Sequence, residues 1–289
     1  MQQSRTITRR SASNLALAFV LLPKAKRDAM SALYAFCREV DDIADNETQP
    51  VEQRRAQLAA WREDIRRACS GAAPEFAVNR ELQPVIQRYD LPFVSFDDII
   101  KGCEMDLDQA RYADFVELSL YCYRVASAVG LLSIQVFGFK NSQCFDYAMH
   151  LGHALQLTNI LRDVREDAAR GRIYLPLSEL KACGVEEVEI LRGQYSPRYR
   201  HLAARVADKA KGHFRRAREL LPAEDRQAMI AAELMGAVYW RLLRKLERRQ
   251  FHVFSDKPVR LGKIHKLLLV LRALGRSAAC LKTSDYGPA

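Results

Sequence analysis

Apolar residues recur along most of the chain at the spacing of one helical face. Met30, Leu33, Cys37, Val40 and Ala44 follow one another at steps of three and four residues, which predicts a helix with one buried side. The same period predicts further helices over residues 51–69, 78–89, 95–109, 114–138, 142–168, 198–221, 224–250 and 260–282. Sustained alternation of apolar and polar residues, which marks half-buried strands, does not occur in the sequence. The pattern therefore predicts an all-α protein of about eight or nine helices.

Nothing in the sequence separates one domain from another. The breaks between predicted helices are single turn residues such as Gly138, Gly171 and Pro222, and there is no internal repeat or long Gly/Ser linker. A chain of 289 residues forms one large domain or two small ones. Without a linker, we expect one domain over residues 1–289.

Two features bear on the compartment. The seven cysteines are scattered and form no CxxC pair, so neither a zinc site nor a redox dithiol is indicated. The apolar run at 15–22 ends at Pro23 and Lys24 without a small-residue cleavage site, unlike a signal peptide. No stretch approaches the roughly 20 uncharged apolar residues that cross a bilayer. We expect a cytoplasmic protein.

Two pairs of aspartates stand four residues apart on two different predicted helices. Asp41 and Asp45 form the first pair, and Asp163 and Asp167 form the second. Side chains at this spacing project from one helical face, about one turn apart. Further polar side chains extend the two stripes, namely Tyr34, Arg38, Gln156 and Asn159. The stripes predict a polar cavity that is lined by carboxylates.

Carboxylates at this spacing repel each other, so a cation would relieve both pairs. Their oxygens are hard ligands that suit Mg²⁺, with a substrate phosphate completing the octahedron. No His or Cys shares the stripes, which argues against zinc. One such pair alone is weak evidence, because a solvated face with basic neighbours usually explains it. Two pairs of identical spacing favour a metal-dependent diphosphate site.

Three segments resemble the squalene/phytoene synthase family. Residues 32–45 are similar to its first aspartate motif, residues 156–176 to its second, and residues 121–130 to its substrate-pocket helix. The motifs occur in order, and the resemblance covers roughly residues 10–270. Within the family, residues 125–138 look most like the bacterial presqualene diphosphate synthases of hopanoid synthesis.

The resemblance implies a single-domain, isoprenoid synthase-like helical bundle with a central cavity. It implies Mg²⁺-dependent, head-to-head condensation of two farnesyl diphosphates to presqualene diphosphate. Squalene synthesis with NADPH and phytoene synthesis from geranylgeranyl diphosphate are the close alternatives, and NADPH is not favoured. An inactive, family-like assembly factor is the alternative from another class; it would have no reason to keep repelling carboxylates.

The resemblance also assigns roles residue by residue. Asp41, Asp45, Asp163 and Asp167 would bind the metals, and Tyr34 and Tyr174 would join them in catalysis. Substrate contacts would come from Arg38, Tyr121, Val125, Ala126, Val129, Gln156, Asn159, Arg162, Arg172, Tyr239 and Arg260. Asp106, in a family-like stretch, is equally compatible with the site and with a capping or ion-pair role.

The net charge of +10 is concentrated at one end of the chain. Residues 241–289 hold 12 Lys and Arg against 3 Asp and Glu, a net of +9. Three interpretations stay open: a solvated helix face, diphosphate contacts from Lys257, Arg260 or Lys263, and peripheral binding to an anionic membrane. Nucleic acid is disfavoured as a partner, because no array of stacking aromatics or DNA-binding motif accompanies the charge.

Overall fold

The helices predicted from periodicity form at the expected places. The computed structural model describes residues 1–10, 17–255, 258–278 and 283–287. Its long helices are α3 (Lys24–Ala44), α4 (Val51–Ser70), α5 (Ala77–Tyr89), α6 (Phe93–Asp108), α7 (Phe115–Cys122), α8 (Ala128–Phe137), α9 (Cys144–Ala169), α12 (Pro197–Leu220), α13 (Ile230–Arg248) and α14 (Lys263–Ala278). No strand occurs within the described ranges, which contain one isolated bridge between Arg111 and Ile173. Lys257, the side chain of Lys263 and residues 279–282 lie outside the description.

The short elements were not predicted. They are α1 (Gln2–Arg10), η1 (Phe19–Leu21), α10 (Leu177–Cys183), α11 (Glu187–Leu191) and η3 (Ala223–Asp225). Segments this short hold too few apolar positions to display a helical period. Local hydrogen bonds define them instead. In α11, the side chains of Glu186 and Glu189 each accept from the other residue's backbone N–H, forming a capping box.

The predicted helix at 114–138 is interrupted by η2 (Tyr123–Ser127), a π-helical segment between α7 and α8. Two glycines on neighbouring helices let η2 pack closely. A Cβ at Gly152 of α9 would lie 2.7 Å from the Cα of Ser127, and one at Gly102 of α6 would lie 2.7 Å from Cγ1 of Val125. Such π-helical turns are frequent at functional sites.

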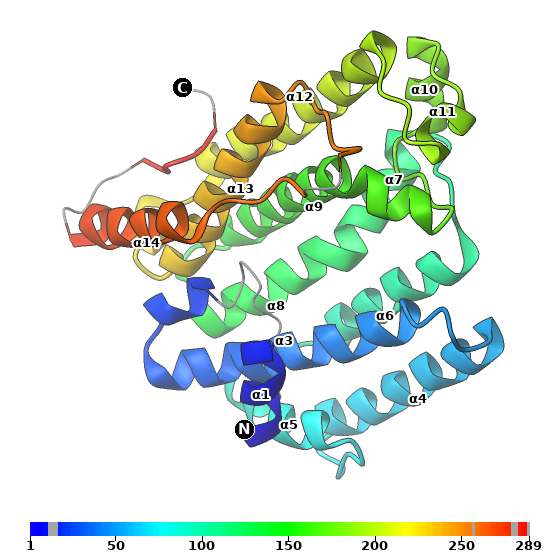
Figure 1. Ribbon diagram of the computed structural model, residues 1–289. Coiled ribbons are helices and arrows are strands. Elements are labelled where there is room, and N and C mark those ends of the chain that lie inside the picture. The colour runs from blue at the N-terminus through cyan, green and yellow to red at the C-terminus, as the bar shows by residue number, and fades with distance from the viewer. Residues whose placement is uncertain (11–16, 256–257, 279–282, 288–289) are drawn as a thin grey trace.

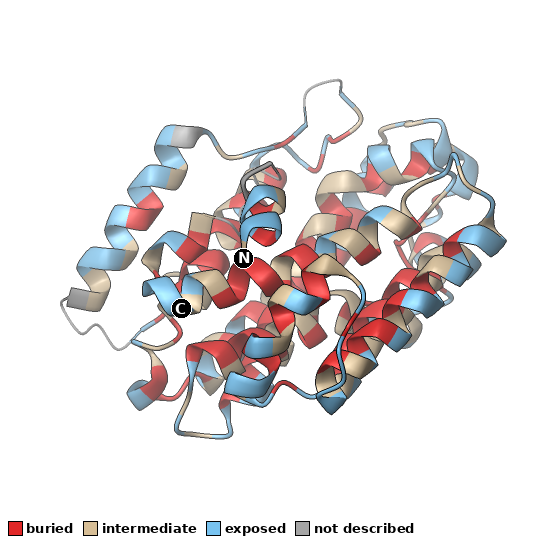
Figure 2. Ribbon diagram, turned by 90° about the horizontal axis from the view of Figure 1, so that it is seen from below, coloured by how far each residue is buried: buried red, intermediate tan, exposed pale blue. Residues whose placement is uncertain are grey.

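The helices are stacked in tiers around α8. Figure 1 shows α8 between α9 on one side and α3 and α6 on the other, and each of these helices contacts it. Helices α12 and α13 pack on α9, while α4 and α5 cover α6 and α3. Buried residues line the inward faces of these helices and form one hydrophobic core, with exposed residues on the outer faces (Figure 2). This arrangement places α3 and α9, which carry the two aspartate pairs, on either side of the interior.

One stretch departs from the sequence expectation about membrane spans. Phe115–Phe137 is long and apolar enough to cross a bilayer, by length and composition alone. Half of its most apolar window is buried inside the protein, where η2 and α8 contact α6 and α9. Core helices of water-soluble proteins meet the same criterion, so this stretch is explained by its place in the core.

Candidate active site

The first aspartate pair lies at the carboxyl end of α3. Arg38 donates to Oδ2 of Asp41 at 3.1 Å and also pairs with Asp42. Burial raises the pKa of Asp41 to about 6, and repulsion from Asp45 adds to the shift. The Asp41 side chain nonetheless keeps 51% of its surface exposed. A carboxylate whose ionised form is destabilised, and whose surface is still open to solvent, is well suited to bind a cation.

The second pair lies in the last turns of α9. Arg162 donates through Nε to Oδ1 of Asp163 at 2.6 Å. Asp167, one turn further, has its pKa raised to about 8 by burial and by the charge of Asp163. The charge of Asp163 therefore destabilises the ionised form of Asp167, as the spacing predicted.

Arg172 connects the two pairs. Helix α9 ends at a turn in which Gly171 has φ +72°, and the backbone N–H of Arg172 donates to the carbonyl of Asp167 at 2.9 Å. This turn directs the Arg172 guanidinium to Asp45, at 3.2 Å, where Arg170 also pairs at 3.0 Å. The end of α9 is therefore bound to the end of α3, and both aspartate pairs border one site.

Asp106 on α6 belongs to this site, which the sequence left undecided. It accepts hydrogen bonds from Tyr174 at 2.6 Å and Tyr121 at 3.2 Å. Burial raises its pKa to about 6, although the Tyr174 hydroxyl and Arg172 oppose the shift. Its charge in turn raises the pKa values of both Asp41 and Asp167. The rings of Tyr174 and Tyr121 pack together and on Tyr112, with centroids 5.0–5.7 Å apart.

A second residue at the site, Lys266 on α14, was not selected from the sequence. Burial lowers its pKa, and repulsion from Arg260 and Arg162 adds to the shift. Arg162 is also hydrogen-bonded to Tyr239, which helps to hold its pKa above the usual range against burial. The C-terminal helix thus brings cations close to the second aspartate pair. Several Lys and Arg residues follow one another in this part of the sequence. The sequence alone does not show which of them lies next to the site.

The remaining polar candidates lie on the same stripe or beside the cavity. Asn159 donates to Gln156 Oε1 at 3.3 Å. Its own Oδ1 is buried and accepts no hydrogen bond from any described residue. The ring of Tyr34 packs edge-on against Phe19, with centroids 6.4 Å apart. The buried, unpartnered oxygen of Asn159 leaves an acceptor on this stripe that a ligand could use.

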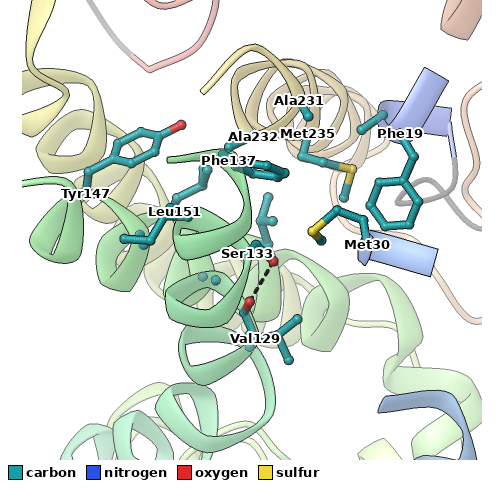
Figure 3. Close-up of a pocket in the computed structure, with 17 residues that line it drawn as sticks. Phe19, Met30, Val129, Ser133, Phe137, Tyr147, Leu151, Ala231, Ala232 and Met235 are labelled. Carbon is teal, nitrogen blue, oxygen red and sulfur yellow. Dashed lines mark hydrogen bonds between the residues drawn. The ribbon is translucent and has the colours of Figure 1, made fainter. Parts of the chain in front are cut away.

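An apolar cavity of ≈ 100 Å³ extends into the bundle (Figure 3). Of the four predicted substrate-pocket residues on η2 and its neighbours, Ala126 and Val129 line it. Val125 and Tyr121 do not: the first packs against Gly102, and the second belongs to the tyrosine cluster. The other walls come from η1, α3, α9 and α13, with Phe19, Met30, Tyr147, Leu151 and Met235 among the side chains drawn in Figure 3.

The carboxylate set fits Mg²⁺ in a particular way. Within the described part of the chain, no three His, Cys, Asp or Glu side chains are grouped closely enough to hold a metal ion by themselves. Mg²⁺ characteristically takes one or two carboxylates and fills its shell with substrate phosphates and water. The raised pKa values and the unpartnered Asn159 oxygen agree with such a shared site. The fit therefore depends on the diphosphate as well as on the protein.

Comparison with known proteins identifies the family of this chain. The family model described as "Squalene/phytoene synthase" matches residues 8–265. The chain belongs to the squalene/phytoene synthase family. A presqualene diphosphate synthase of Rhodopseudomonas palustris is 39% identical over 90% of this chain and 92% of its own. A 15-cis-phytoene synthase of Synechococcus elongatus is 37% identical over 89% and 86%. The crystal structure of a dehydrosqualene synthase in complex with ligand superposes with a TM-score of 0.83, at 28% identity and covering 96% and 95%.

Proposed function

We propose that this protein is a Mg²⁺-dependent prenyltransferase that condenses two molecules of farnesyl diphosphate to presqualene diphosphate. The observation that carries the proposal is the site itself. Two aspartate pairs, on α3 and α9, meet around Arg172 and Asp106. An apolar cavity lies in the same bundle, bordered by both of these helices. A charged head next to an apolar pocket matches a prenyl diphosphate.

The polar end is suited to hold diphosphates. Arg38, Arg162, Arg172 and Lys266 supply positive charge beside the aspartates. Mg²⁺, when bound by the aspartates, neutralises phosphate oxygens and makes the diphosphate a better leaving group. Guanidinium groups that are already oriented stabilise the charge that develops as the C–O bond breaks. Of the four aspartates assigned to the metal, Asp41 and Asp167 have pKa values that burial raises, and this strain would be relieved by the bound cations.

The apolar cavity is suited to the next step. Breaking the allylic C–O bond sends the electron pair to the diphosphate and leaves a carbocation. Water must be kept away until the double bond of the second chain attacks and a proton is lost as the cyclopropane ring closes. Small side chains such as Ala126 and Val129 leave room there, and aromatic rings such as Phe19 can stabilise the cation.

A second candidate is phytoene synthesis from the C20 substrate, geranylgeranyl diphosphate. This alternative is supported by the relative from Synechococcus elongatus, whose name states phytoene synthase activity. Incubation with each diphosphate and Mg²⁺, with and without NADPH, separates the alternatives by product analysis. We expect presqualene diphosphate from farnesyl diphosphate without NADPH. Phytoene from the C20 substrate, with the C15 substrate inert, would refute the proposal.

We also propose that the protein works in the cytoplasm, on the inner face of the cell membrane. A C30 product is insoluble in water and needs a lipid phase to enter. The basic excess of residues 241–289 is consistent with an anionic leaflet.

A further inference from the structure

Helix α14 turns an apolar face to solvent. Five of its large apolar side chains are between 46% and 77% exposed, and they follow one another at steps of three, one, three and three residues: Ile264, Leu267, Leu268, Leu271 and Leu274. We call these five residues the apolar stripe. Figure 2 shows this helix at the edge of the molecule. Leaving five large apolar residues exposed on one helical face is costly in water, so the stripe calls for a partner.

The stripe is distinct from the face by which α14 joins the protein. Leu269 and Val270 are buried, and α14 packs on α13. Lys266 on the same helix is partly buried, and the charge of Arg162 contributes to lowering its pKa. The fold therefore uses the inner face of α14 for packing and for the site, and it leaves the stripe uncovered by any described residue.

A groove of ≈ 550 Å³ rich in basic residues borders the stripe where α13 ends and α14 begins. We call it the basic groove; its lining is Trp240, Arg241, Arg244, Lys245, Arg248, Arg249, Leu261, Gly262 and His265. Arg244 pairs with Glu247 at 2.6 Å and Arg241 with Asp285 at 3.4 Å. Among the described residues, no carboxylate pairs with Arg248 or Arg249. Within the described part of the chain, the groove thus keeps positive charge without an anionic partner, at the first turn of α14, where the stripe begins.

We propose that the apolar stripe and the basic groove form one docking surface for an anionic lipid bilayer. The stripe enters the boundary between headgroups and acyl chains, and the groove takes lipid phosphates. A second copy of the chain is the alternative occupant, but a two-fold contact pairs the stripe with the same stripe of the other copy, whose five residues carry no negative charge for the groove. A bilayer supplies apolar and anionic groups together. The inference rests on the proposed function only for its purpose, delivery of a C30 lipid, because binding requires no turnover.

Vesicle flotation with the full-length protein tests the proposal. Wild type should float with vesicles of phosphatidylglycerol and phosphatidylcholine and not with phosphatidylcholine alone. Replacing three stripe residues with glutamine, which keeps helix propensity, should lower partitioning about tenfold: Leu267→Gln, Leu268→Gln and Leu271→Gln. A matched triple variant on other faces should float like wild type: Val94→Gln, Val116→Gln and Val188→Gln, whose side chains are 59%, 80% and 46% exposed.

The groove is tested separately. Arg248→Gln with Arg249→Gln should weaken binding to anionic vesicles severalfold and reduce its dependence on salt. Equal flotation on neutral and anionic vesicles, or an unchanged stripe variant, would overturn the proposal. So would a stripe variant that changes a dimer to a monomer by light scattering while still floating, because the stripe would then be a subunit interface.

Turnover of farnesyl diphosphate, measured without vesicles in the same preparations, separates this inference from the proposed function. Intact turnover without flotation overturns only the docking surface. Intact flotation without turnover overturns only the proposed activity.

Discussion

The polar end of the site and the apolar cavity differ in whether their polar groups have hydrogen-bond or charge partners within the protein. At the polar end, Asp41, Asp106 and Asp167 are ionisable groups whose pKa burial raises, and Asn159 Oδ1 has no described partner. In the cavity wall, the few polar atoms are used: Ser133 donates to the carbonyl of Val129 at 2.7 Å. One region is incomplete without a charged ligand, whereas the other is complete and apolar.

This difference suggests a division of labour. An incomplete polar region gains free energy when cations and a diphosphate arrive, which favours departure of the leaving group. A satisfied apolar wall offers no nucleophile to a carbocation and keeps water away from it. Substitutions in the two regions should therefore fail in different ways, and four sets of substitutions test whether they do.

The largest effect is expected from the metal-binding pairs. Asp41→Asn and Asp163→Asn each remove one negative charge that would hold Mg²⁺, and each should lower kcat for farnesyl diphosphate by about 10³-fold. The steady-state rate as a function of Mg²⁺ concentration is the measurement. Asp108→Asn is the matched control, since Asp108 pairs with Arg55 on the surface and is 56% exposed. Rates that stay near wild type in both site variants would remove the metal assignment.

The next effect is expected in the cavity. Ala126→Leu adds three carbons to a wall of a cavity of ≈ 100 Å³, so kcat/KM should fall by about 10²-fold through overpacking and lost substrate space. The Mg²⁺ dependence should not move, in contrast to the aspartate variants. Val129→Ala enlarges the same wall and should raise the relative rate with the C20 substrate. If neither Ala126→Leu nor Val129→Ala changes the ratio of the rates with the C15 and C20 substrates, the prenyl chain does not bind in this cavity.

Much of this architecture follows from sequence periodicity, but less of the site does. The helices that carry Asp41 and Asp163, and the common face of each pair, are local properties, and the structure has them as predicted. That Arg172 reaches Asp45, 127 residues away, depends on packing between helices. The sequence left Asp106 undecided and did not select Lys266, because a single charged residue has no spacing signal; burial near the other charges distinguishes both. Val125 is the opposite case: the sequence selected it as a pocket residue, but it lies in the π-helical segment and packs against Gly102 of α6 instead.

A smaller effect is expected from the tyrosine cluster. The Tyr174 hydroxyl donates to Asp106 and opposes the rise in its pKa, so Tyr174→Phe should raise that pKa further. The acidic limb of the kcat profile should then move to higher pH, with kcat lowered about tenfold at pH 7. Tyr112→Phe is the control: its ring stacks on Tyr174, but its hydroxyl has no hydrogen-bond partner among the described residues. Identical profiles for the two variants would remove Asp106 from the mechanism.

The smallest effect concerns stability rather than rate. Burial and Asp163 raise the pKa of Asp167 from its ordinary value of 3.8 to about 8, so the folded protein holds this proton more tightly than the unfolded chain. The resulting stabilisation is fully present below pH 4 and is lost as the pH rises through about 8. Asp167→Asn, which stays neutral, should therefore raise Tm by a few degrees at pH 8 in EDTA and have less effect at pH 5. Mg²⁺ with diphosphate should stabilise wild type more than the variant, because the bound cations favour the ionised carboxylate. Thermal melts at both pH values decide the point, and an equal Tm difference at pH 5 and pH 8 would show that Asp167 is not the group strained by its neighbours.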